Sequence, residues 1–131
     1  MTRRHSPKTY IAKAERALST ARLNLKAKDP DGACDRAYYA MFNAAHAALF
    51  ALGAEGVTRP IKTDSGLEAK FGQEVIVAGH LPAEHGRNLS KVQKYREVAD
   101  YSAEPVEVTD AAWSIEQAAA FVDAVKTKFG L

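Results

Sequence analysis

Apolar residues recur along this chain at alternating steps of three and four, which is the spacing of one face of an α-helix. Five such stripes follow one another. No segment keeps the strict alternation of a strand, since 106–108 is too short to form a sheet. The pattern therefore predicts an all-α fold of five helices. The apolar positions expected to pack together are Ile11, Ala14, Leu18, Ala21 and Leu25 in the first helix, Tyr38, Met41, Phe42, Ala45, Leu49 and Leu52 in the second, Leu67, Phe71, Val75 and Ala78 in the third, Leu89, Val92, Tyr95 and Val98 or Ala99 in the fourth, and Ile115, Ala118, Val122, Val125 and Phe129 in the fifth.

Residues that start and stop helices separate these stripes. Ser6 followed by Pro7 is typical of a helix start, and Asp29-Pro30 ends the first helix and caps the second. Gly53 offers the second helix a left-handed end, and residues 53–63 read as a loop. The remaining expected boundaries are an N-cap at Asp64 or Ser65 and an end at Ala78-Gly79 for the third helix, Leu81-Pro82 to about Tyr101 for the fourth, and an N-cap at Thr109 and a stop at Gly130 for the fifth.

Length and composition bound the class of protein. At 131 residues the chain suits one domain, expected over residues 1–131, and 47% hydrophobic with 26% charged residues is typical of a globular protein. Cys34 is the only cysteine, so no internal disulfide forms. No apolar run approaches the roughly 18 residues of a membrane span. We therefore expect a cytoplasmic protein that makes no contact with a membrane.

Charge is distributed unevenly although the net charge is only +2. Residues 1–28 carry a net charge of +7, and residues 102–131 carry −3. A basic first helix suits phosphates or an acidic partner, because clustered charge acts through its local field. A plain solvated helix face explains the same residues equally well. The basic residues of the first segment are Arg3, Arg4, Lys8, Lys13, Arg16, Arg22, Lys26 and Lys28, against the single acid Glu15.

Several kinds of functional site are excluded by their missing motifs. The histidines lack the spacing of three or four residues that places two imidazoles on one helix face, and no Glu-x-x-His pair occurs. There is also no glycine-rich phosphate loop and no Gly-x-Ser-x-Gly turn. We expect neither a metal nor a cofactor.

Two polar clusters remain. On the second helix, Arg36, Tyr39 and Asn43 fall opposite the apolar face and offer a cation, a phenol and an amide to one ligand. The alternative is that Arg36 pairs with an acid on another helix, because no acid stands three or four residues before it. Near the end of the fourth helix, residues 95–101 form the second cluster. Here the alternative is an intrahelical ion pair between positions 96 and 100 and a packing tyrosine.

These segments together resemble the HEPN family (higher eukaryotes and prokaryotes nucleotide-binding domain), in its small stand-alone prokaryotic branch. The resemblance spans roughly residues 8–128, and its motifs are specific only in combination. The carrying residues are Asp35-Arg36-Ala-Tyr38-Tyr39-Ala-Met-Phe42-Asn43, Lys62-Thr-Asp64-Ser-Gly66-Leu67 with Phe71, Leu81-Pro82, and Arg96-x-x-Ala99-Asp100-Tyr101.

The resemblance implies a HEPN-like fold: an antiparallel four-helix bundle core with a fifth helix, commonly paired as a homodimer. Many relatives are encoded beside a minimal nucleotidyltransferase in toxin–antitoxin or related modules. Active members are metal-independent ribonucleases. They use an arginine followed by several residues and a histidine, near the end of a late helix that faces its mate across the dimer cleft.

This chain departs from that pattern at the histidine. The fifth position after Arg96 is Tyr101, and no histidine follows Arg96. Cleavage through the 2′-hydroxyl needs a proton carrier near neutral pH, which histidine suits and tyrosine does not. Asp64 stands where many relatives have another histidine. The remaining local candidate is His46, about 80° round the second helix from Arg36.

Three hypotheses follow. The leading one is a nucleotide- or RNA-binding HEPN-type module, dimeric and working with a nucleotidyltransferase-like partner, in which Arg96 holds phosphate, Asp100 orients Arg96 and Tyr101 stacks or donates a hydrogen bond. In this hypothesis Arg36, Tyr39 and Asn43 form a second binding patch. The second is a metal-independent endoribonuclease toxin with a degenerate Arg-x4-Tyr motif, in which Arg96 and Tyr101 are the catalytic candidates and Tyr101 or His46 moves the proton. The third is a structural module whose groove binds a protein.

Overall fold

The computed structural model describes residues 6–54 and 56–131, and within them it contains helices and no strand. The all-α prediction is therefore confirmed. Arg3 and Arg4 of the basic first segment lie outside the described residues. The elements are α1 (Pro7–Lys26), α2 (Pro30–Leu52), α3 (Asp64–Phe71), the π-helix η2 (Gly72–Val77), α4 (Ala83–Tyr101) and α5 (Val108–Phe129).

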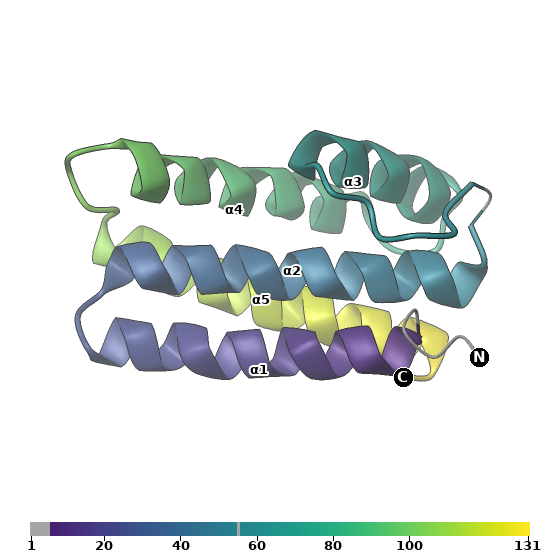
Figure 1. Cartoon of the computed structure of the whole chain (residues 1–131), viewed down its shortest axis with the longest axis horizontal. Coiled ribbons are helices and arrows are strands. Elements are labelled where there is room, and N and C mark those ends of the chain that lie inside the picture. The colour runs from purple at the N-terminus through teal and green to yellow at the C-terminus, as the bar shows by residue number, and fades with distance from the viewer. Residues whose placement is uncertain (1–5, 55) are drawn as a thin grey trace.

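The four long helices form an antiparallel bundle around α2 (Figure 1). Helices α1 and α4 lie on opposite sides of α2, and α5 packs behind it (Figure 1). The short α3 lies beside the first part of α4, so that α3 and α4 together cover one side of α2 (Figure 1). This arrangement brings the start of α3, the middle of α2 and the end of α4 close to one another.

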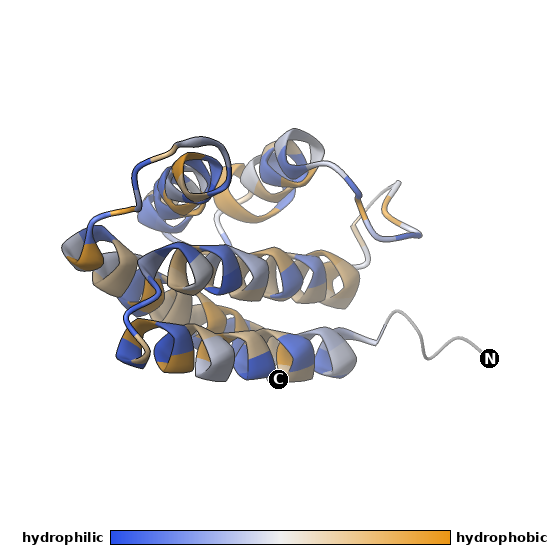
Figure 2. Ribbon diagram, turned by 60° about the vertical axis from the view of Figure 1, so that its left-hand side comes forward, coloured by the Kyte–Doolittle hydropathy of each residue, from blue (hydrophilic) through white to orange (hydrophobic). Residues whose placement is uncertain are grey.

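Alanine allows α2 to take the central position. Its buried residues include seven alanines, whose small side chains let neighbouring helices approach closely. Figure 2 shows hydrophobic and hydrophilic residues alternating around the helices, as expected for amphipathic helices that share one core. The large side chains that fill the core come from every long helix and from α3, and they include Leu18, Met41, Leu49, Leu67, Phe71, Leu89, Phe121 and Val125.

Most of the expected core positions are buried. Leu25, Phe42, Leu52, Tyr95, Ala99 and Phe129 are only half-buried, and Val98 is exposed. Ala78 is exposed as well, so its placement in the core is wrong. The predicted core positions did not include Phe121. This residue is fully buried and packs on Phe71, with the two ring centroids 5.1 Å apart. A stripe of every third or fourth residue misses such a position because α5 faces several neighbours.

The expected helix ends are largely confirmed. Ser6 is the N-cap of α1, and Gly53 and Gly130 end α2 and α5 in the left-handed conformation. Two caps differ. Thr63, rather than Asp64 or Ser65, caps α3, because its Oγ1 accepts a hydrogen bond from Gly66 N–H at 3.1 Å.

The start of α5 also differs from the expectation, since Glu107 takes the N-cap position that Thr109 was expected to fill. The cause lies one residue earlier in the chain. Val106 is buried, and its N–H donates to Asp31 Oδ1 at 2.8 Å. The chain is thus held against the start of α2 at Val106, and the helix begins directly afterwards.

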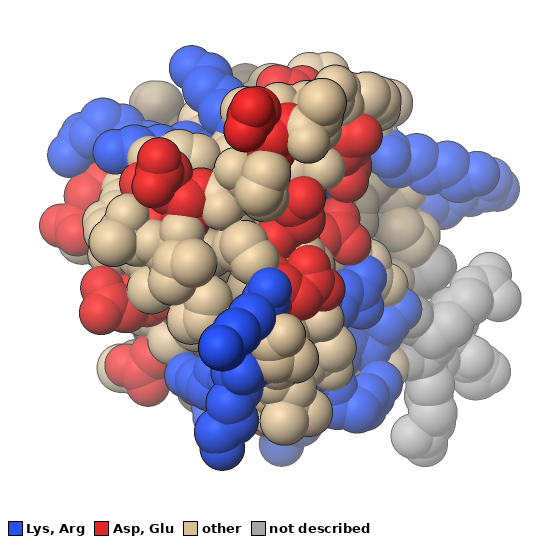
Figure 3. All heavy atoms as spheres, turned by 90° about the vertical axis from the view of Figure 1, so that its left-hand side faces the viewer, with Lys and Arg blue, Asp and Glu red and all other residues tan. Residues whose placement is uncertain are grey.

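Charge on the surface follows the helices. On the end face shown in Figure 3, Asp and Glu side chains gather across the middle, and Lys and Arg side chains lie around them, at the lower edge on the side of α1 and also at the upper left and the right. Glu15, the one acid of α1, pairs with Lys126 of α5, with 2.7 Å between Oε2 and Nζ. None of the described helices combines the length and the apolar character needed to cross a membrane.

Candidate functional site

Arg96 joins α4 to the start of α3. Its Nη2 donates to Asp64 Oδ2 at 2.6 Å, and its Nη1 lies 4.0 Å from Asp100 Oδ2. The guanidinium carbon also lies 5.1 Å from the centroid of the Tyr38 ring. The intrahelical pair with Asp100 considered from the sequence is therefore the looser of two contacts, and the main partner is 32 positions away.

A cavity of about 190 Å³ opens beside this ion pair. We call it the Arg96 cleft. Helix α2 supplies the aromatic rings of its lining and one carboxylate, and the loop before α3, α3 and α4 supply the other charged groups. Two carboxylates and two cations stand around it, so its lining has no net formal charge. The lining residues are Asp35, Tyr38, Tyr39, Phe42, Lys62, Asp64 and Arg96.

Arg96 keeps unused donor capacity. Its Nε is buried and has no hydrogen-bond partner among the described residues, although Nη2 is bonded to Asp64. About a quarter of the side chain, 26%, remains accessible to solvent. The guanidinium is thus held in place without being closed off, and the cleft beside it stays open.

Tyr38 is a hydrogen-bond donor in this cleft rather than a base. Burial raises the pKa of its hydroxyl far above the usual value, and the carboxylates of Asp64 and Glu68 raise it further. The hydroxyl donates to Glu68 Oε2 at 3.3 Å. Glu68 also accepts a hydrogen bond from Ser90 on α4, at 2.9 Å, which links α2, α3 and α4 below the cleft. Tyr38 therefore stays protonated at neutral pH.

Tyr101 lies away from the Arg96 cleft. It is the last residue of α4, is 84% exposed and takes no part in lining the cavity. The reason is helical geometry, because five positions along a helix turn the side chain about 140° from Arg96. Within one chain, the structure therefore does not bring Arg96 and Tyr101 together in one groove. Asp100 stays near Arg96 but outside the cavity lining.

The second predicted patch is only partly assembled. The Arg36 guanidinium stacks on the Tyr39 ring, with its carbon 4.4 Å from the ring centroid, and no ion pair of Arg36 occurs among the described residues. Asn43 does not belong to this patch. It is 2% exposed, and its Nδ2 donates to the Tyr39 carbonyl at 2.9 Å. The prediction failed because α2 is the central helix, so residues opposite its main apolar face are also covered.

His46 holds the loop that follows α2. It is fully buried; its Nδ1 donates to the Phe42 carbonyl at 2.9 Å, and its Nε2 accepts from Ile61 N–H at 2.8 Å. Burial lowers the pKa of this imidazole below its usual value. With both nitrogens engaged, and among the rings of Tyr10, Phe42 and Phe50, His46 has no route to carry protons to the Arg96 cleft.

Of the residues that line the cleft, only Tyr39 and Arg96 were assigned to a binding site from the sequence. Asp64 was named as a possible N-cap and as replacing a histidine. Asp35 and Lys62 appeared only among the motif residues that carry the family resemblance. Contacts between α2, α3 and α4 depend on how the helices pack, which periodicity does not reveal. Among the described residues, no group of three or more His, Cys, Asp or Glu side chains is placed to hold a metal ion.

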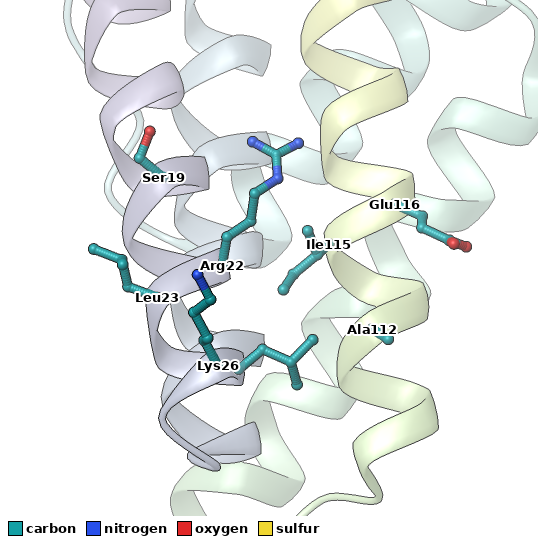
Figure 4. A pocket seen from close by; sticks show the side chains of 8 residues that line it. Ser19, Arg22, Leu23, Lys26, Ala112, Ile115 and Glu116 are labelled. Carbon is teal, nitrogen blue, oxygen red and sulfur yellow. The ribbon is translucent and has the colours of Figure 1, made fainter.

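A larger groove lies on another side of the molecule, between α1 and α5 (Figure 4). Its volume is about 700 Å³, and Arg22 and Ile115 reach into it from the two helices (Figure 4). Its lining is largely aliphatic, with Leu23, Leu25 and Ile115, and it contains no aromatic ring and no residue of the motifs. Its chemistry therefore does not suit a nucleotide.

Comparison with known proteins places the chain in a family. The family model of the HEPN domain matches residues 8–128. The chain belongs to the HEPN domain family, in agreement with the resemblance seen in the motifs. The helical bundle is thus a HEPN domain, and residues 8–128 include both sides of the Arg96 cleft.

Individual relatives come from bacteria and an archaeon. A UPF0332 protein of Gloeobacter violaceus is 37% identical over 89 residues, which cover 68% of this chain and 67% of that protein. A protein of Methanocaldococcus jannaschii that is named a putative toxin is 30% identical over 123 residues, covering 94% of this chain and 88% of that protein. A UPF0332 protein of Thermotoga maritima is 30% identical over 118 residues, covering 87% and 83%.

Proposed function

We propose that this HEPN domain binds a nucleotide or RNA, with a base held in the Arg96 cleft, and that it acts with a nucleotidyltransferase-like partner in a toxin–antitoxin-like system. The observation that carries the proposal is the cleft itself. It combines aromatic rings, an arginine whose side chain is 26% exposed, and two carboxylates within one cavity. The similarity to a relative named a putative toxin, which extends along 94% of this chain, supports a role in a toxin–antitoxin-like system.

The size of the cleft favours a base over a whole nucleotide. Pockets that enclose complete small molecules have volumes of roughly 300–1,000 Å³, and this cavity has about 190 Å³. Tyr39 is only half-buried, and a base stacked on its ring would gain about 1–3 kcal/mol. Asp35 and Asp64 would accept hydrogen bonds from exocyclic amino groups or ribose hydroxyls, and Arg96 would donate to base carbonyls.

Pairing of two copies belongs to the same proposal. Three large apolar side chains are exposed around the end of α4 and the start of α5: Val98 at 46%, Tyr101 at 84% and Val108 at 59%. An exposed apolar group of this kind suits a protein contact. A two-fold axis here would bring two Arg96 clefts toward each other, and Tyr101 of one copy could then reach the cleft of the other.

Binding is favoured over RNA cleavage by the positions of the proton carriers. Cleavage at neutral pH needs a group that titrates there. Tyr38 has a raised pKa, and His46 is buried with both ring nitrogens bonded. Tyr101 turns away from the Arg96 of its own chain. None of these three side chains is therefore placed to carry a proton in the Arg96 cleft of its own chain.

The test is a comparison of variants in the intact chain. Nucleosides, nucleoside 5′-monophosphates and short single-stranded RNA are titrated into the wild-type protein, Arg96→Ala and Arg87→Ala. The last variant removes an exposed arginine of the same helix that does not line the cleft. We expect Arg96→Ala alone to weaken binding by about tenfold, the effect of one charge-assisted hydrogen bond. Equal affinities for all three proteins would contradict the proposal.

A further inference from the structure

A second cavity lies on the other side of Tyr39. It has a volume of about 250 Å³, and we call it the basic pocket. Helix α1 supplies one side of it and α2 the other. All of its charged residues are cations. The lining residues are Lys13, Arg16, Ala17 and Thr20 from α1, with Arg36 and Tyr39 from α2.

The cations of the basic pocket are not neutralised within the described part of the chain. No ion pair of Lys13, Arg16 or Arg36 occurs there. Glu15, which stands between two of them in sequence, instead pairs with Lys126 on α5. Helix α1 thus presents its one acid to α5 and two of its cations to the pocket.

Tyr39 positions two of these cations. The Arg36 guanidinium carbon lies 4.4 Å from the centroid of the Tyr39 ring, and Lys13 Nζ lies 5.9 Å from it. Such cation–π contacts fix the side chains without using their N–H donors. Arg36 and Lys13 make no hydrogen bond among the described residues, so their donors remain available for an anion. A guanidinium beside an ammonium is well suited to phosphate.

The two cavities complement each other, because Tyr39 lines both of them. The Arg96 cleft has aromatic rings and a balanced charge, which suit a base, whereas the basic pocket has three cations and no acid. A nucleotide divides its chemistry in the same way, with a flat base at one end and phosphate at the other. Proteins that hold single-stranded nucleic acid combine a basic track with stacking rings in this manner.

We infer that the basic pocket formed by Lys13, Arg16 and Arg36 is a phosphate subsite, which holds a phosphate of the same nucleotide or RNA strand whose base occupies the Arg96 cleft. The inference rests on the proposed function for the identity of that base. It assigns the phosphate to α1 and Arg36 rather than to Arg96, whose charge is already shared with Asp64 and Asp100.

The experiment compares two double variants of the whole chain. Lys13→Met with Arg16→Met removes two pocket cations and keeps their apolar stems, and both residues lie on the outer helix α1. The matched control is Arg22→Met with Lys26→Met, which makes the same charge change on the same helix but in the α1–α5 groove. Thermal unfolding of both variants verifies that they remain folded. Inorganic phosphate, nucleosides, nucleoside 5′-monophosphates and an eight-nucleotide single-stranded RNA are the probes.

We expect the pocket variant to bind RNA and the monophosphates at least tenfold more weakly than the control variant. Nucleoside binding should be the same in both. The dependence of RNA affinity on salt should become shallower by about 0.7 for each lost cation that contacts the strand. Equal loss in both variants, or no loss in the pocket variant, would overturn the inference. Competition by an acidic peptide but not by phosphate would also overturn it.

The outcomes separate this inference from the proposed function. Nucleoside binding that is lost in Arg96→Ala, together with an unaffected pocket variant, would retain the base site and reject the phosphate subsite. Phosphate and RNA binding that is lost in the pocket variant, with no effect of Arg96→Ala and no nucleoside binding, would retain the subsite and reject the base site.

Discussion

Arg96 Nη2 lies 2.6 Å from Asp64 Oδ2, and this ion pair connects the last turns of α4 to the first turn of α3 at the edge of a cavity. Both side chains are about three-quarters buried, with 26% and 27% exposed. The pair therefore has two consequences. It ties two helices together, and it fixes the guanidinium beside the aromatic wall of the cleft.

The ion pair should contribute to stability. Arg96→Ala leaves the Asp64 carboxylate without its partner in a partly buried position, and we expect the free energy of unfolding to fall by about 1 kcal/mol. Asp100→Asn should change it by no more than a few tenths of a kcal/mol, because that pair is 4.0 Å long and more exposed. Urea denaturation of the two variants measures both values. Equal destabilisation by Arg96→Ala and Asp100→Asn would contradict the assignment of Asp64 as the main partner of Arg96.

Stability should fall as the pH drops below about 6.5. Burial lowers the pKa values of His46 and His85 below that of an unfolded-chain histidine. The unfolded chain therefore binds more protons than the folded one in that range, and each group can add up to about 1.4 kcal/mol per pH unit to the slope. The contribution of the two neutral histidines to the free energy of unfolding is fully present above about pH 6.5 and is lost on acidification.

Urea denaturation between pH 5 and pH 8 measures this slope, and His85→Gln isolates one of the two groups. The variant should lose part of the acid destabilisation while keeping its stability at pH 8, where the neutral side chain is little changed. His46→Gln should lower stability at every pH as well, because the anchor to Ile61 N–H is weakened. A wild-type slope that His85→Gln and His46→Gln both leave intact would contradict this assignment.

Cys34 should react slowly in the folded protein. It is fully buried, with Sγ 3.9 Å from Ser114 Oγ, and burial raises the pKa of the thiol to about 11. Both the closed environment and the small thiolate fraction at pH 8 slow a disulfide reagent. We expect modification to follow unfolding, so that the rate rises steeply with urea. Rapid labelling in buffer, at the rate of a free thiol, would show that this part of the core opens easily.

Pairing of two chains should depend on the apolar residues around the end of α4. Val98→Asp or Tyr101→Asp places a charge in the proposed contact, and we expect either variant to be monomeric by sedimentation where the wild type is a dimer. Leu23→Asp is the control, since Leu23 is 65% exposed on α1. A dimer that survives both α4 variants but not Leu23→Asp would place the contact on the α1–α5 face instead.

The helices were predictable from the sequence because each depends on residues close together in the chain. Ser6-Pro7, Gly53 and Gly130 act within one turn of the helices that they begin or end. The cleft was only partly predictable, because its key contact joins positions 64 and 96 through packing. Arg36 and Tyr39 were recognised from one helix, but their neighbour Lys13 comes from another and appeared in the sequence only as part of a basic segment.

The errors have equally specific causes. Asn43 was assigned to an open face because a helical wheel contains no information about neighbours on its second side, and α2 is central. Tyr101 was grouped with Arg96 because the two residues belong to one motif, yet five positions turn them about 140° apart on the same helix. A motif defined by sequence spacing can gather residues that meet only between two copies of the chain.

The location of the ligand can be measured with the isotope-labelled protein. Titration of a nucleoside 5′-monophosphate should shift the backbone amide resonances of residues 35–42, 62–64 and the last turns of α4, with a second group around residues 13–20. At the ligand concentration that half-saturates the wild type, Arg96→Ala should leave the first group nearly unmoved, because its binding is expected to be about tenfold weaker. Shifts confined to the α1–α5 groove, or identical shifts in the wild type and in Arg96→Ala, would show that the Arg96 cleft is not the nucleotide site.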